Sequence, residues 1–467
     1  MKEQKNRKGL SRTLKLFYGV GDFGFTLMCN VENYFFNFFL TDLAQFPLAI
    51  VSLITTVSSV ADAALSWIYG AIINSTKPGR WGRYRTWLVL TPWIVPFIYA
   101  FQFVKIGNGI LPVIIIIAAS ILSHVLFTFP VVASVSLMTV AGKTAEERAQ
   151  LSSVRAMWNS FSKIIFSYVG VPLAAIFAGI LGETNQYAGV AFCLAAVMVV
   201  GFYVHFKMFD GYEEVITEPQ KKKDDASRTK GKDLIRSLMK NPSLIFLLLA
   251  NLSDYIYNFI CAGVAVYYFN YVVDRPELLA VYIMISNVTG ILGSYFNKVL
   301  VKKIESRNIF IGTLFGMALL LIVSFFTGEM VYVVIVLMCL VQFGYGIIYA
   351  CTPVLYSDTI IYSEWKTGKN ATGWISGLQQ LPLKLGVVTR GIIISACLAI
   401  AGFETGMNVS TVTEGVKQGI CTAFMIIPAV FLILGALLMM FGFKLTKEKV
   451  ARYQEEIRQR RSVEGGN

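Results

Sequence analysis

Long apolar runs alternate with short polar stretches along this chain, and twelve such runs can be marked. A helix needs about 20 residues to cross roughly 30 Å of hydrocarbon, and the runs reach that length. A membrane β-barrel shows short segments of alternating polarity instead. The pattern therefore predicts an all-α polytopic membrane protein with twelve transmembrane helices. The expected spans are residues 15–40, 47–73, 86–105, 110–140, 153–181, 187–208, 242–272, 277–302, 308–328, 331–361, 371–402 and 416–444.

The composition agrees with a lipid environment. Of the 467 residues, 55% are hydrophobic and only 15% are charged. Soluble domains carry about 25% charged residues, which they need to cover their surface. The seven cysteines all fall in apolar runs without C-x-x-C spacing, so we expect them to be packing residues.

The positions of the charges predict the orientation of the chain. Lys and Arg cluster in the N-terminal tail, after the second and eighth spans, between the sixth and seventh, and in the C-terminal tail. All of these segments fall on one side, so the positive-inside rule predicts a multi-pass plasma-membrane protein with cytoplasmic N- and C-termini. This topology accounts for the net charge of +13. A nucleic-acid partner is not expected, because the charge is not gathered on one folded face.

One long hydrophilic stretch divides the chain into two halves. Residues 209–241 have the composition of a solvated cytoplasmic linker. They separate a six-helix bundle at 1–208 from a second one at 242–444, and residues 445–467 form a cytoplasmic tail. Six plus six helices with a charged central loop indicate the major facilitator fold, in which two bundles rock about a site near the midplane.

Charged and polar residues inside the first two spans mark candidate functional positions. A buried charge costs on the order of 3 kcal/mol, so a retained one normally faces a cavity or a partner. In the first span, one helical face carries Asp22, Thr26, Asn33 and Asn37, with Glu32 about 100° away. In the second, a polar stripe contains Thr55, Ser59, Asp62, Ser66 and Tyr69. A lone Asp can also be a structural hydrogen-bonding residue, but the stripe favours a cavity lining.

Other spans supply possible partners. Arg155, Asn159 and Lys163 share a face of the fifth span, where the cations can point at the acids or, for Arg155, reach the cytoplasmic surface. His124 and Thr128 share a face of the fourth, where the histidine can carry protons or only satisfy a hydrogen bond. Amide and aromatic groups in the tenth and eleventh spans suit a hydroxylated solute, although they also occur in ordinary helix packing.

Enzyme chemistry is not expected. The sequence shows no metal-ligand cluster, nucleophilic triad, P-loop or Gly-rich dinucleotide motif, and it has only two His. We therefore predict neither catalytic residues nor a bound metal or organic cofactor.

Several motifs, in this order and over nearly the full length, resemble the glycoside-pentoside-hexuronide cation symporters. They are YGVGDFG at 18–24, FFLTD at 38–42, DA at 62–63, GRWGRYRTW at 79–87, ER at 147–148 with LSS at 151–153 and Arg155, YYFNY at 267–271, and DTIIYSEWKTG at 358–368. The resemblance implies a symporter of the major facilitator superfamily in which the acid of the second span binds the coupling cation. It also implies a sugar enclosed by the first, fourth, fifth and eleventh spans.

Carried over by position, Asp62 is the cation-site acid and Lys384 is the lysine of the eleventh span. Two departures modify this picture. Ser66 stands where the sodium-coupled pattern has a second carboxylate, which weakens a sodium site and slightly favours H⁺ over Na⁺. Thr26 and Val131 stand where the melibiose branch has sugar-binding carboxylates, and Glu32 is a candidate to replace them.

We therefore predict cation-coupled symport of a sugar or glycoside by alternating access, through a protein that works as a monomer in the bilayer. The alternatives are a carrier of a non-sugar organic solute and a transporter-like membrane sensor. The predicted cation-binding residues are Asp62, Ser66 and Ser59. The predicted substrate-binding residues are Asp22, Thr26, Glu32, Thr128, Arg155, Asn159, Trp374, Gln380 and Lys384.

Overall fold

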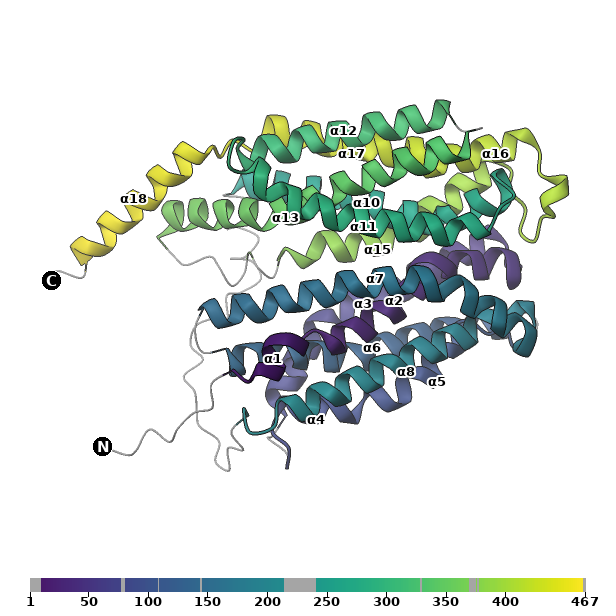
Figure 1. The fold of residues 1–467 in the computed structure, drawn as a ribbon, viewed down its shortest axis with the longest axis horizontal. Helices are drawn as coiled ribbons and strands as arrows, with labels where there is room; N and C mark the ends of the chain where they lie inside the picture. Colours follow the sequence, from purple (N-terminus) through teal and green to yellow (C-terminus); the bar gives the residue numbers. More distant parts are fainter. Residues whose placement is uncertain are drawn as a thin grey trace. The chain divides into compact units, whose positions relative to one another are not determined.

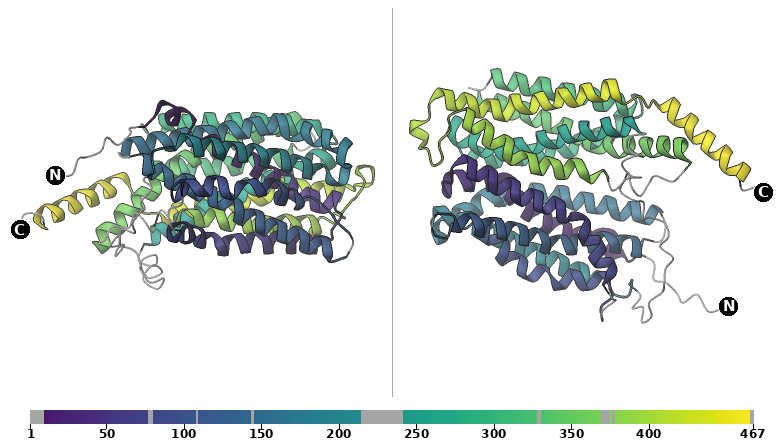
Figure 2. Two further views of the ribbon diagram at one scale, coloured as in Figure 1. Left: turned by 90° about the horizontal axis from the view of Figure 1, so that it is seen from below. Right: turned by 180° about the vertical axis from the view of Figure 1, so that it is seen from behind.

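The computed structural model describes residues 10–76, 80–107, 109–142, 145–213, 241–327, 330–368, 375 and 378–464. Its elements are helices (Figures 1 and 2). The chain divides into two compact units. The first comprises Met1–Gln220, Pro276–Met284 and Phe403–Thr411, and the second comprises Lys221–Arg275, Ile285–Gly402 and Val412–Asn467.

The N-terminal part of the first unit is built around α2. Its elements are α1 (Arg12–Phe17), α2 (Val20–Phe38), η1 (Phe39–Leu43), α3 (Leu48–Ser75), α4 (Tyr84–Leu90), η2 (Pro92–Ile94), α5 (Val95–Phe101), α6 (Leu111–Ala141), α7 (Ala145–Leu181), η3 (Glu183–Asn185) and α8 (Gln186–Met208). Helix α2 packs against α7 and α8, while α6 packs against α3, α4 and α5. Glycines allow the closest approach, because a Cβ on Gly24 would lie 2.5 Å from the Met198 Cα of α8.

The remaining helices centre on α10 and α12. They are α10 (Pro242–Tyr267), η4 (Tyr268–Val272), α11 (Glu277–Leu300), α12 (Ser306–Phe326), α13 (Val331–Thr367), α15 (Gln380–Ile400), η5 (Val409–Thr411), α16 (Glu414–Cys421), η6 (Thr422–Ile426), α17 (Ile427–Gly442) and α18 (Lys447–Glu464). Helix α10 packs against α15 and α17, and α12 packs against α13 and α17.

Ten helices in the described part of the chain are long and apolar enough to cross a membrane, and each matches one predicted span. The two other predicted spans are helical but do not meet that standard. The span at 15–40 corresponds mainly to α2, whose Asp22, Asn30, Glu32, Asn33 and Asn37 lower its hydropathy. The span at 86–105 is divided into α4, η2 and α5 at Pro92, because proline has no N–H to donate and its ring clashes with the carbonyl of the preceding turn. The count of twelve therefore stays a prediction.

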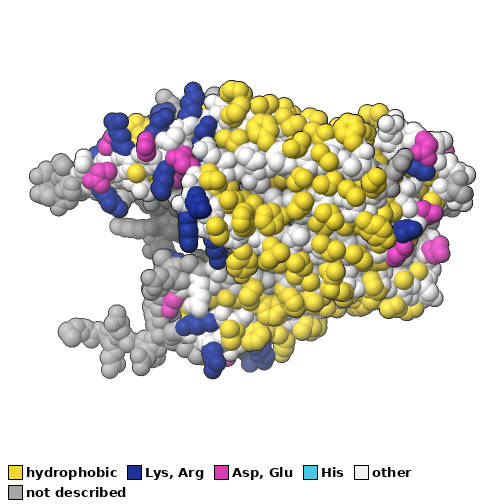
Figure 3. Space-filling model, turned by 45° about the horizontal axis from the view of Figure 1, so that its top comes forward, with side chains coloured by type: hydrophobic (Ala, Val, Ile, Leu, Met, Phe, Trp, Pro, Cys, Tyr) yellow, Lys and Arg dark blue, Asp and Glu magenta, His cyan; other side chains and the backbone are white. Residues whose placement is uncertain are grey.

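The surface of the helices fits a lipid surrounding. Figure 3 shows hydrophobic side chains over the middle of the helices, with most of the visible Lys and Arg side chains near one end. Large apolar side chains such as Ile180, Phe326 and Ile400 are more than half exposed. In water this surface would be a severe aggregation liability, whereas lipid tails accept it.

The loop before α4 is held by one carboxylate. Glu213 accepts hydrogen bonds from the backbone N–H groups of Arg83 (2.5 Å), Tyr84 (2.9 Å) and Arg85 (3.1 Å). These are amides at a helix start, which have no partner within the helix. Gly82 precedes them with a φ of +100°, a conformation that favours glycine. The GRWGRYRTW motif is thus anchored to the segment that follows α8.

The segment predicted as a cytoplasmic tail contains helix α18. The Trp365 indole at the end of α13 donates a 2.6 Å hydrogen bond to Glu456 Oε2, and its ring stacks on Tyr453 at 4.3 Å. Arg460 donates to the Trp365 carbonyl at 2.9 Å. The hydrogen bonds from Trp365 and Arg452 hold the pKa of the Glu456 carboxyl below its usual value. The tail helix is therefore docked on α13 within the second unit.

Candidate functional site

The first pair of predicted site residues is an ion pair between α2 and α7. Arg155 Nη2 lies 2.5 Å and Nε 2.7 Å from Asp22 Oδ1. The Asp22 side chain is 1% exposed and that of Arg155 is 26% exposed. Asp22 lies in the first turn of α2, where the helix dipole also favours a negative charge. Arg155 therefore points at an acid rather than only toward a membrane surface.

One turn further along both helices, a second pair of predicted residues meets. Thr26 donates a 3.1 Å hydrogen bond to Asn159 Oδ1. Ser162 donates to the Phe23 carbonyl at 2.8 Å on the same contact. Four predicted substrate residues thus line one polar seam between α2 and α7, because each helix presents side chains at i and i+4 on the same face.

His205, to which sequence reasoning assigned no role, accepts a hydrogen bond from the start of α2. The N–H of Gly21 donates to His205 Nε2 at 3.2 Å, and Ser134 Oγ lies 3.2 Å from His205 Nδ1. A backbone N–H can only donate, so Nε2 accepts and the ring proton is on Nδ1. His205 is buried and stacks on Tyr18. The only signal available in the sequence was a histidine inside an apolar run.

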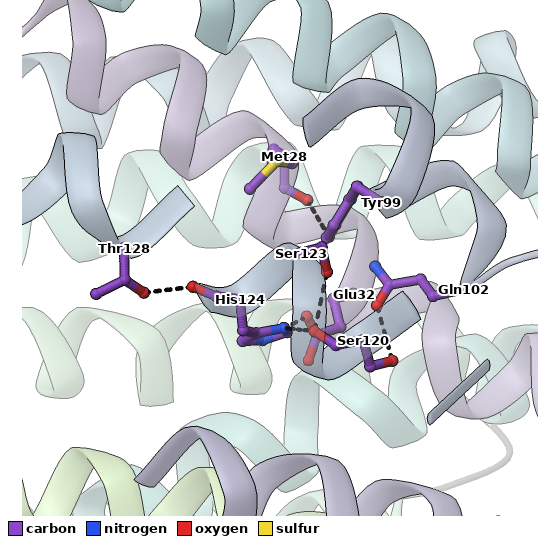
Figure 4. A network of polar contacts seen from close by, with 8 residues as sticks. All are labelled: Met28, Glu32, Tyr99, Gln102, Ser120, Ser123, His124 and Thr128. Atoms are coloured by element: carbon purple, nitrogen blue, oxygen red, sulfur yellow. Dashed lines mark hydrogen bonds and ion pairs between the residues drawn. The ribbon is translucent and has the colours of Figure 1, made fainter. Parts of the chain in front are cut away.

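Glu32, Thr128 and His124 form a second polar cluster, between α2 and α6 (Figure 4). His124 Nε2 lies 3.3 Å from Glu32 Oε2, and Nδ1 lies 2.7 Å from the Ser120 carbonyl oxygen. Thr128 donates to the His124 carbonyl at 2.6 Å, so its hydroxyl proton is used within α6. The contact between Glu32 and His124 was not predicted, although both residues were noted as polar groups inside spans.

Asp62 lies on α3 and is 8% exposed. It acts electrostatically on His124 of α6, against which α3 packs. Ser59 is half-buried, one turn before Asp62. The side chain of Ser66 lies outside the described ones. Three acids on α2 and α3 and the bases on α6 and α7 are thus gathered within the first unit.

The predicted residues of the eleventh span belong to the second unit. Gln380 begins α15 and is exposed, and Lys384 is half-buried one turn later. Trp374 lies outside the described residues. The same helix carries Arg390, only 4% exposed, with its guanidinium 5.7 Å from the centre of the Phe259 ring. Sequence reasoning missed this buried cation, which is stabilised in part by the aromatic face.

The model of a family described as "MFS/sugar transport protein" matches residues 17–447. The chain belongs to this sugar-transport family. A protein of Escherichia coli strain K12 proposed to be a sulfoquinovose importer is 25% identical over 96% of this chain and 94% of its own length. The isoprimeverose transporter of Lactiplantibacillus pentosus is 24% identical over 83% of this chain and 80% of its own length.

Solved structures agree on the fold of this family member. A D-xylose-proton symporter superposes with a TM-score of 0.63 at 15% identity, covering 93% of this chain and 98% of that one. The major facilitator fold and the resemblance to glycoside-pentoside-hexuronide symporters are confirmed. The relatives are transporters, so the prediction that the chain is not an enzyme is confirmed as well. The roles of the individual site residues stay predictions.

Proposed function

We propose that this family member carries a sugar or glycoside across the plasma membrane together with a cation, by alternating access, with both termini in the cytoplasm. The observation that carries the proposal is the set of charged residues on spans of a sugar-transport family: Asp22, Glu32, Asp62 and Arg155 on α2, α3 and α7. Charged side chains within membrane spans are costly and mark solute or ion pathways. Relatives named as a putative sulfoquinovose importer and an isoprimeverose transporter support a sugar as the solute.

The cation role falls to Asp62, with Ser59 and Ser66 as oxygen donors. A single carboxylate with hydroxyl neighbours suits a proton better than sodium, which prefers several oxygen ligands. We therefore favour H⁺ over Na⁺, and we expect no cofactor besides the coupling cation. A single polypeptide contains all of the proposed residues, so a monomer suffices.

The solute role falls to polar side chains that form hydrogen bonds with hydroxyl groups. On α2, α6 and α7 these are Asp22, Thr26, Glu32, Thr128, Arg155 and Asn159; Trp374, Gln380 and Lys384 complete the set. In the described structure, Thr26 and Asn159 satisfy each other. A sugar hydroxyl, which both donates and accepts, can replace either partner at little cost.

Uptake into proteoliposomes with imposed pH or sodium gradients tests this proposal. A panel of labelled sugars and glycosides would be presented to the wild type and to Asp62→Asn. We expect gradient-driven accumulation in the wild type, and in Asp62→Asn exchange without accumulation. Asp274→Asn makes the same chemical change at an exposed loop residue with a φ of 54°, which Asn tolerates, and should behave as wild type.

Two outcomes would refute the proposal. If inserted, folded protein moves no member of the panel, sugar transport is wrong. If Asp62→Asn accumulates solute as well as Asp274→Asn does, the assignment of the cation site is wrong. The remaining alternative is a carrier of a non-sugar solute. Competition of labelled sugar uptake by unlabelled organic acids and nucleosides distinguishes it from a sugar carrier.

A further inference from the structure

Glu32 and His124 form a partly buried contact that the proposed coupling at Asp62 does not use. Their side chains are 14% and 17% exposed, and they come from α2 and α6. Around them, Ser120 donates to Gln102 Oε1 at 3.0 Å and Tyr99 donates to the Met28 carbonyl at 2.8 Å (Figure 4). These neighbouring polar groups are therefore engaged in contacts of their own, and the imidazole and the carboxylate lie against each other.

The partners of the imidazole determine how many protons the pair holds. His124 Nδ1 lies 2.7 Å from a carbonyl oxygen, which can only accept, so Nδ1 carries a hydrogen. His124 Nε2 lies 3.3 Å from a carboxylate oxygen of Glu32. With no proton between them, a nitrogen lone pair would face an oxygen lone pair in a water-poor site, which is unfavourable. One proton therefore lies between the two residues, on either the ring or the carboxyl group.

The second histidine of the chain shows the opposite arrangement. His205 Nε2 accepts from the Gly21 N–H, so a proton on that atom would break the contact. The chain has only two histidines, and by their contacts only His124 has oxygen acceptors at both ring nitrogens. His205 is thus a natural reference for any measurement on His124.

The charges on every helix packed against α6 bear on this proton. Glu32 of α2 and Asp62 of α3 act electrostatically on His124. On α4, Arg85 is bound to Asp210 and to the Phe206 carbonyl. Helix α5 contributes the uncharged Tyr99, and η2 contributes no titratable group. The cations of α7 in its spanning part are Arg155, which is bound to Asp22, and Lys163. Of these charged groups, the two that act electrostatically on the imidazole, Glu32 and Asp62, are both negative.

We propose that Glu32 and His124 form a partly buried one-proton site whose proton affinity depends on the charge on Asp62. A cation that neutralises Asp62 weakens the hold of the pair on its proton, and by linkage a proton on the pair weakens cation binding at Asp62. The pair makes the cation site respond to pH. This inference rests on the proposed function only for the role of Asp62 as the cation site.

The test uses the proton itself as the ligand and does not require transport. Protein labelled with ¹⁵N-histidine in phosphatidylcholine–phosphatidylglycerol nanodiscs gives signals from two imidazoles, while infrared spectra report protonated carboxyl groups. At pH 7 we expect His205 to carry one ring proton. We expect His124 either to carry two, or to carry one together with a protonated carboxyl band that Glu32→Gln removes. A single proton then leaves the pair as the pH rises.

Variants decide whether the site is a pair and whether Asp62 governs it. In Glu32→Gln, His124 should carry a single ring proton at pH 7, and no protonated carboxyl band from residue 32 should remain. Asp62→Asn should make the pair lose its proton at a pH about one unit lower, a tenfold fall in proton affinity. Ser123→Ala is the matched control, because Ser123 is buried and donates to the same Ser120 carbonyl but cannot titrate. It should titrate as wild type.

Two results would overturn the inference. One is a neutral His124 at pH 7 without any carboxyl band that depends on Glu32. The other is a His124 titration that Asp62→Asn leaves where Ser123→Ala leaves it. Monodisperse elution of each variant and an unchanged His205 signal establish that the fold is intact. Since none of these readouts involves a sugar, failure of the transport proposal in liposomes remains a separate result.

Discussion

Removal of one side of the ion pair between Asp22 and Arg155 should destabilise the protein unequally. Arg155→Gln leaves a carboxylate that is 1% exposed without its counter-charge, and Asp22 Oδ2 already has no hydrogen-bond partner in the described structure. Breaking a buried pair in this way costs about 3–5 kcal/mol. Asp22→Asn instead leaves an arginine that is 26% exposed and can turn toward water, so we expect a cost of only about 1 kcal/mol.

The double variant and a conservative variant sharpen this prediction. Asp22→Asn removes the buried carboxylate that Arg155→Gln would leave without its counter-charge. The double variant should therefore be more stable than Arg155→Gln alone. Arg155→Lys keeps the charge but loses the paired Nε and Nη2 contacts with Oδ1, and should fall between wild type and Arg155→Gln.

Unfolding by SDS in mixed micelles measures these free energies. The reasoning is refuted if Arg155→Gln and Asp22→Asn cost the same within about 0.5 kcal/mol, or if their costs simply add in the double variant.

Three other contacts lead to predictions that can be measured. Gly24→Ala puts a Cβ 2.5 Å from an α8 Cα and should cost about 1–3 kcal/mol in the same assay; equal stability of Gly24→Ala and Gly179→Ala, whose Cβ would meet nothing within 4 Å, would contradict this. Glu213→Ala should speed hydrogen exchange at the three amides that begin α4, since a helix cap contributes about 1 kcal/mol; unchanged exchange would exclude the cap. Folding lowers the pKa of Glu456, so its contribution to docking α18 is complete above the ordinary carboxyl pKa and is lost as pH falls through the lower folded value. Acid should therefore change Trp365 fluorescence in wild type, and Glu456→Gln should lack that change.

Local periodicity was enough to predict which residues share a helix face. Asp22 and Thr26, like Arg155 and Asn159, are four residues apart, and the structure shows each pair side by side on its helix. A proline at position 92 was also visible in the sequence, but Pro130, Pro172 and Pro353 lie inside continuous helices. The sequence therefore did not indicate which proline divides a span. The division into two six-helix bundles at 1–208 and 242–444 stays a prediction.

Partners on other helices were harder to predict. His124 was noted for its own face of α6, but no feature of that segment indicates that Glu32 of α2 lies opposite. His205 and Arg390 are single polar residues in apolar runs, and their acceptor and aromatic contacts come from distant segments.

By itself, the sequence determined the solvent, the all-α class, most of the spans and the family, because hydrophobicity and helical period are local properties of the chain. Only the tertiary structure decided which charges meet. Helix contacts depend on where small residues such as Gly24 let two backbones approach, and that approach sets the register at which Asp22 reaches Arg155. Residues far apart in sequence acquire their electrostatic partners only once this packing is in place.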